Sequence, residues 1–210
     1  MTDLSKNQNY GNSTPVIYLV SAHTASSPGI CYGGRREAAD CEELCRALEK
    51  SILSLSPEIP VCVMSGMKNT GQVKPGDLLF VFHRDFGGKG TPKKGASVFV
   101  KENACASVQY QAYSLLSAVC GEKGFRYNGV HPVTAKSPFR SLYRALPQYS
   151  FYLSAGFMGN EEDNKIFDAL TGENISLLAK SITGIYKEKK YEDNTTVYKA
   201  SFGGEQVKAS

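Results

Sequence analysis

The sequence predicts an α/β fold, a three-layer α/β/α domain with a mainly parallel central sheet. Short runs of β-branched and aromatic residues, typical of strands buried on both faces, alternate with segments whose apolar residues recur at helical spacing. The chain has 210 residues, 41% of them hydrophobic, which is enough to bury one sizeable core. We therefore expect one domain over residues 15–187, between a polar N-terminal segment (1–14) and a polar C-terminal tail (188–210).

The first half of the chain predicts three strands and one helix. The run from Val16 to Val20 is continuously apolar and β-branched or aromatic, as in a central strand. A loop rich in glycine and proline follows, and then small or apolar residues recur with helical spacing. The expected elements are, in order, a strand at 16–20, a loop at 24–36, a helix at 38–55, and strands at 61–64 and 78–82.

The second half continues the alternation of strands and helices. Asn160, followed by three acidic residues, is typical of a capped helix start, because an asparagine side chain accepts hydrogen bonds from the first turn. The expected elements are a loop at 87–95, a strand at 96–100, a helix at 103–119, a loop-rich segment at 121–138, a strand at 150–153, helices from 161 and at 175–186, and a possible strand at 196–202.

Charge and hydropathy exclude two classes of partner. The formal net charge is only +4 and no block of like charges marks a nucleic-acid-binding arm, so nucleic acid is not expected. No apolar run approaches the roughly 20 residues of a membrane span. Residues 1–14 lack the apolar stretch of a secretory signal, so we expect a soluble protein that is made without a signal peptide.

The six cysteines are too sparse for a disulfide scaffold and include no C-x-x-C pair. Cys41, Cys45 and Cys62 lie among apolar residues, which favours small buried hydrophobic side chains over metal-binding or catalytic thiols. We expect reduced cysteines and no cysteine-ligated zinc.

Two of the three histidines, His23 and His83, follow strands of the buried type. Ligands of open α/β sheets bind at the carboxyl ends of strands, and catalytic zinc sites commonly take two histidines, one carboxylate and an open position. Glu37 offers the carboxylate, because the loop after His23 could fold it onto the same edge. The pattern alone leaves a second interpretation open, in which the histidines are structural and Glu37 complements the helix dipole.

The order of these features resembles the zinc-dependent N-acetylmuramoyl-L-alanine amidases of the Amidase_3 type. The resemblance rests on His23 before a Gly/Pro loop, Glu37 opening a helix, and His83 ending a strand, and then on the segments GASVFV from Gly95 and YLSAGFMGNEED from Tyr152. It covers roughly residues 15–186. It implies that His23, Glu37 and His83 hold one zinc ion. It also implies hydrolysis of the amide between N-acetylmuramic acid and L-alanine, with peptidoglycan or a muropeptide as the partner.

The chain departs from the family pattern beside both histidines and at the catalytic position. Ser21-Ala22 and Thr24-Ala25 replace the glycines around His23, and Arg84-Asp85 follows His83, which would add bulk and charge beside the metal. Ser154 stands where the family carries its catalytic glutamate. A serine hydroxyl cannot act as a carboxylate base, so the activity is expected to be attenuated unless another group substitutes. The candidate substitutes are Asp85, His131, Glu161 and Glu162.

Two alternatives follow from these departures. A degenerate family member could keep the fold, with or without the metal, as a module that binds peptidoglycan or a protein partner. A zinc hydrolase with altered neighbours could instead act on a different amide. The residues that would alter the substrate groove are Arg84, Asp85, Lys89, Lys93 and Lys94. In either cell-wall role a chain without a signal peptide would reach the wall by lysis, a phage or a secretion apparatus.

Overall fold

A computed structural model describes residues 14–121, 123–134, 137, 147–172 and 174–202 of the chain. Its centre is a six-stranded sheet with the strand order β4-β1-β5-β8-β6-β7. All neighbouring strands are parallel except β6 and β8, which are antiparallel. The strands are β1 (Ile17–Ser21), β4 (Val61–Ser65), β5 (Leu78–Asp85), β6 (Ala96–Lys101), β7 (Tyr127–Val133) and β8 (Ser150–Phe157). The predicted α/β class and mainly parallel sheet are confirmed.

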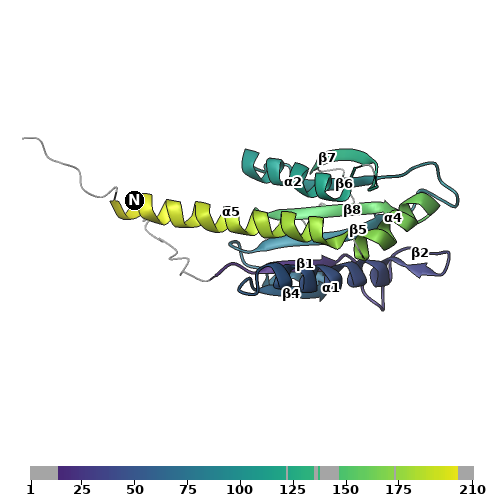
Figure 1. The fold of residues 1–210 in the computed structure, drawn as a ribbon, viewed down its shortest axis with the longest axis horizontal. Coiled ribbons are helices and arrows are strands. Elements are labelled where there is room, and N and C mark those ends of the chain that lie inside the picture. The colour runs from purple at the N-terminus through teal and green to yellow at the C-terminus, as the bar shows by residue number, and fades with distance from the viewer. Residues whose placement is uncertain (1–13, 122, 135–136, 138–146, 173, 203–210) are drawn as a thin grey trace, which may run out of the picture.

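Three long helices cover one face of the sheet. Figure 1 shows α5 lying along the sheet between α1 and α2, and α5 contacts both of these helices. The helices are α1 (Glu37–Leu55), α2 (Ala106–Val119), α4 (Glu161–Thr171) and α5 (Ile175–Phe202), with a short 3-10 helix, η1 (Met67–Gln72), and a small hairpin of β2 (Cys31–Tyr32) and β3 (Arg35–Arg36).

The strands alternate between two apolar clusters, as expected for a sheet that is covered on both sides. In β1, Ile17 and Leu19 belong to the large cluster with the buried faces of α1, α2 and α5. Val20 points to the other face and joins a smaller cluster that includes Met67 of η1 and Val81 of β5. The same alternation along β5 determines which of its side chains lie on the same face as Val81 and which lie on the helix-covered face.

Two segments differ from the sequence-based expectation. Helix α5 continues to Phe202, so the end at residue 186 and the strand at 196–202 were wrong; no glycine or proline interrupts residues 185–202 to stop the helix. Strand β7 lies in the segment expected to be loop-rich. It is an edge strand with mostly exposed or half-buried residues and contains Gly129 and Pro132, so its sequence lacks the apolar pattern of a buried strand.

All six cysteines are free. Cys41 and Cys45 are buried in α1, as predicted, and burial raises the pKa of both thiols, which keeps them protonated. Cys62 is half-buried. Among the described residues, no helix is long and apolar enough to cross a membrane.

Candidate metal centre

The two strand-end histidines lie side by side because β1 and β5 are adjacent parallel strands. Ser21 of β1 pairs with Phe82 of β5, so both strands end at the same edge of the sheet. The ring centroids of His23 and His83 are 5.8 Å apart.

Glu37, the first residue of α1, places its carboxylate between these rings. Its side chain is only 1% exposed, and Oε1 lies 3.4 Å from Nε2 of His23 and 3.1 Å from Nε2 of His83. Oε2 accepts a hydrogen bond from the backbone N–H of Ile30 (3.0 Å), and Oε1 accepts one from the N–H of Arg84 (3.2 Å). A helix-dipole role alone would not require this burial, so it does not by itself account for the contacts of Glu37.

The loop between His23 and Glu37 is fixed at its closing end. The N–H groups of Glu37 and Ala38 donate to the carbonyls of Ile30 and Pro28, at 2.9 and 3.1 Å. Gly29 has a positive φ of 68°, and a Cβ there would lie 2.7 Å from Cδ2 of the His23 ring and closer still to Oε2 of Glu37. Sequence reasoning treated Gly29 as an ordinary loop glycine, although the Pro28-Gly29 pair signalled a tight turn.

The three side chains fit a zinc ion. One potential ligand atom from each lies within 4.8 Å of the other two. Tetrahedral zinc with bonds of about 2.0–2.1 Å separates its ligand atoms by roughly 3.3–3.4 Å, close to the two measured separations from Glu37. Burial lowers the pKa of His83, although the nearby Glu37 carboxylate opposes this, so the ring is neutral and able to bind a metal at neutral pH.

The Arg84 side chain does not line this centre, contrary to the expectation that it would add bulk and charge beside the metal. Successive residues of a strand point to opposite faces, so the Arg84 side chain enters the helix-covered face and is fully buried there. Its guanidinium donates to Asp40 (2.7 Å), Asn164 (2.7 Å) and the Ala155 carbonyl, and it stacks over the ring of Phe167. Arg84 therefore ties α1 and α4 to the sheet behind the candidate metal ligands.

Ser154, the predicted catalytic position, lies beside His83. The two residues are register partners in β5 and β8, and the Ser154 side chain is buried, with the residue 2% exposed. Its hydroxyl donates a short hydrogen bond to Oδ2 of Asp85. The Oδ1 atom of the same carboxylate is 3.5 Å from Nδ1 of His83.

Of the four candidate substitutes for the missing glutamate, Asp85 is the one that contacts a candidate ligand in the described structure. Glu162 forms an ion pair with Lys94, with 2.7 Å between Oε2 and Nζ. The charge of Lys94, one of the residues expected to alter the substrate groove, is therefore paired. His131 is exposed, and its Nε2 contacts the Asn128 carbonyl at 3.1 Å. Glu161 is exposed in the first turn of α4, where the Asn160 side chain caps the helix as predicted.

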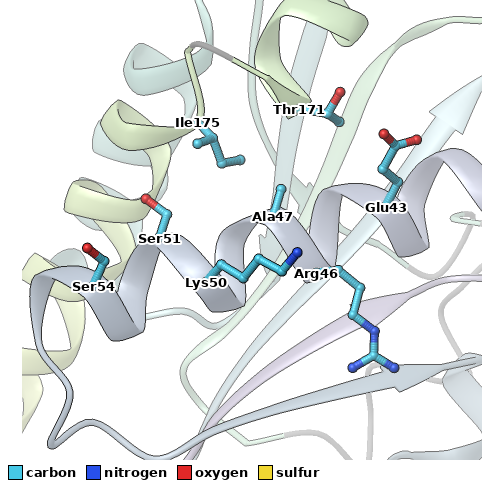
Figure 2. A pocket seen from close by; sticks show the side chains of 8 residues that line it. All are labelled: Glu43, Arg46, Ala47, Lys50, Ser51, Ser54, Thr171 and Ile175. Atoms are coloured by element: carbon cyan, nitrogen blue, oxygen red, sulfur yellow. The ribbon is translucent and has the colours of Figure 1, made fainter.

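A separate hollow of about 550 Å³ lies on the outer side of α1, next to the end of α4 and the start of α5 (Figure 2). Its lining includes Arg46 and Lys50 of α1 and Ile175 of α5, and none of the three candidate metal ligands. This hollow is therefore distinct from the metal centre.

Comparison with known proteins finds a shared fold. No protein-family model matches the chain, and no curated protein sequence matches it. Among solved structures, an N-acetylmuramoyl-L-alanine amidase from Clostridium difficile 630 is similar over 84% of this chain and 97% of its own, with a TM-score of 0.62 and 15% identity. The catalytic domain of the amidase CwlV from Bacillus (Paenibacillus) polymyxa var. colistinus matches over 85% and 98%, with a TM-score of 0.60 and 15% identity.

A third structure, the N-acetylmuramyl-L-alanine amidase of Mycobacterium smegmatis, matches over 85% of this chain and 100% of its own, with a TM-score of 0.58 and 13% identity. The matches thus span nearly the whole of each amidase structure. This chain has the fold of the N-acetylmuramoyl-L-alanine amidases.

Proposed function

We propose that the protein is a zinc-dependent amidase of the Amidase_3 type that hydrolyses the bond between N-acetylmuramic acid and L-alanine in peptidoglycan. The observation that carries the proposal is the Glu37 carboxylate oxygen lying within 3.4 Å of Nε2 of both strand-end histidines. The amidase fold of the whole domain supports the same assignment. Its place of action would be the cell wall.

His23, Glu37 and His83 would hold the ion, and the hydrogen bonds from Ile30 and Arg84 would keep the Glu37 carboxylate in its orientation. A zinc ion bound there would supply a Lewis acid that could polarise the scissile carbonyl and make water a usable nucleophile near neutral pH. The His23 side chain is 32% exposed, so this ligand would be reachable from solvent.

The chain lacks the family's glutamate for the proton transfers of the reaction. A positioned general acid–base group typically contributes about 10²–10⁴-fold in rate, and Ser154 cannot provide it. The Asp85 carboxylate is engaged by Ser154 and faces Nδ1 of His83, the ring nitrogen opposite the one near Glu37. We therefore propose slow hydrolysis relative to an amidase that carries the glutamate.

The Ser154–Asp85 contact also favours a second candidate function, a metal-holding module that binds peptidoglycan without cleaving it. In that case the domain would keep its ion, while the catalytic position would serve only to hold Asp85. Binding and cleavage measured on the same preparation separate the two functions.

The test combines metal analysis with an assay for amino-terminal L-alanine released from peptidoglycan. We expect one zinc ion per chain, and loss of that ion in His23→Ala and in His83→Ala. His131→Ala is the matched control, because this exposed histidine lies outside the triad. Stoichiometric zinc in the double variant of His23 and His83 would contradict the metal assignment. Tight peptidoglycan binding without exposure of amino-terminal L-alanine would select the binding module.

A further inference from the structure

The second ring nitrogen of His83, Nδ1, is not one of the proposed metal-binding atoms, and its surroundings need a separate explanation. With Nε2 directed toward Glu37 and the proposed ion, the neutral ring carries its proton on Nδ1. Nδ1 is buried, and among the residues that the structure describes no group makes a hydrogen bond to it. A buried N–H without an acceptor loses the hydrogen bond that it would make to water, so the site needs an acceptor here.

Asp85 lies where that acceptor would have to be. Residues 83 and 85 of β5 point to the same face of the sheet, and Oδ1 of Asp85 is 3.5 Å from Nδ1 of His83. This separation exceeds the upper end of the N–H···O hydrogen-bonding range, about 3.2 Å, by only about 0.3 Å. The ring of Tyr152, centred 5.4 Å from the His83 ring, packs beside the imidazole.

Ser154 holds Asp85 in this orientation. The Asp85 side chain is 40% exposed, so without a partner it would sample several rotamers in water. The buried Ser154 hydroxyl donates to Oδ2 of Asp85 and leaves Oδ1 turned toward His83. The β5–β8 register shifts between His83 and Asp85, and the Ser154–Asp85 contact crosses the two strands at this point.

We propose that Asp85, held by Ser154, is a positioning residue that fixes the tautomer and the ring orientation of His83 for metal binding. Ser154 would then hydrogen-bond to Asp85, Asp85 to Nδ1 of His83, and Nε2 of His83 would bind the ion. Carboxylates that accept the outer N–H of a metal-bound histidine raise its basicity, and their removal typically lowers metal affinity by about 10–100-fold. This inference rests on the proposed metal centre, because it assigns an outer partner to one of its ligands.

The experiment measures the zinc dissociation constant by competition with a chelator, together with the visible spectrum of the cobalt-substituted protein. Asp85→Ala removes the acceptor and should weaken zinc binding by about 10–100-fold. Asp85→Asn keeps a carbonyl oxygen as acceptor and should recover part of the loss. A role limited to folding would show no such graded rescue, and melting temperatures of all variants report folding separately.

Ser154→Ala tests whether Ser154 affects zinc binding through Asp85. It should weaken zinc binding less than Asp85→Ala, and the double variant should bind zinc as Asp85→Ala does, because Ser154 acts through Asp85. Glu42→Gln is the matched control, since it removes one carboxylate that pairs with Arg46 on the exposed side of α1. Zinc affinity and cobalt spectrum should be unchanged in this control.

Two results overturn the inference, and they differ from failure of the metal centre. Parental zinc affinity in Asp85→Ala would show that His83 needs no such partner. Fully additive losses in the double variant would show that Ser154 does not act through Asp85. A parent chain that binds no zinc would refute the metal centre itself and the inference with it.

Discussion

Replacing Gly29 with alanine tests whether the loop backbone shapes the metal centre. The new Cβ would lie 2.7 Å from Cδ2 of His23, whereas ordinary contact begins at 3.4 Å, so the ring must shift by about 0.7 Å. Metal ligands tolerate displacements of only about 0.2 Å from ideal bond lengths. The Glu37 carboxylate is closer still to the new atom and cannot move without breaking its contact with the Ile30 N–H.

Gly33→Ala is the matched control, because Gly33 lies in the same loop, has a positive φ of 60°, and would place its Cβ in open space. Both variants carry the left-handed backbone penalty of roughly 1–2 kcal/mol, which lowers the melting temperature of each. Only Gly29→Ala should also lose zinc affinity, by at least about 10–100-fold. Chelator competition and thermal melting measure the two effects. Equal zinc affinity in the two variants would refute the argument that Gly29 makes room for the ligands.

Three further predictions concern the catalytic position, the buried arginine and the cysteines. At saturating zinc, the double variant Ser154→Glu/Asp85→Asn keeps the net charge and should raise the rate of amide hydrolysis by up to about 10²–10⁴-fold. Ser154→Glu alone should raise it less, because it sets two carboxylates side by side. No gain in either variant would show that the base lies elsewhere. Arg84→Met should lower the free energy of unfolding by about 3 kcal/mol, because it leaves a buried carboxylate with one partner fewer. The exposed control Arg46→Met should change it by less than about 1 kcal/mol in denaturant titration. Reductant should leave the melting temperature unchanged, since all six thiols are free, and a drop of several degrees would reveal a disulfide.

Local sequence pattern was sufficient where the structure depends on near neighbours in the chain. The apolar runs of β1 and β5 and the helical spacing in α1 predicted these elements, because burial on both faces or on one stripe leaves a direct trace in the residues. The edge strand β7 left no such trace, because all of its residues except Val133 are exposed or half-buried. The length of α5 was missed because its continuation beyond residue 186 is polar and resembles a polar tail in sequence.

The sequence by itself determined the class of fold and the three candidate ligands, because strand-end histidines and a helix-start glutamate are local features. Tertiary structure alone decided what surrounds them. Arg84 and Asp85 are neighbours in the chain, yet the pleat of β5 sends the first into the buried ionic network and leaves the second beside His83. The Ser154–Asp85 contact depends on the register of two strands that are about 70 residues apart in sequence, and a register is fixed by the packing of the whole sheet rather than by either segment.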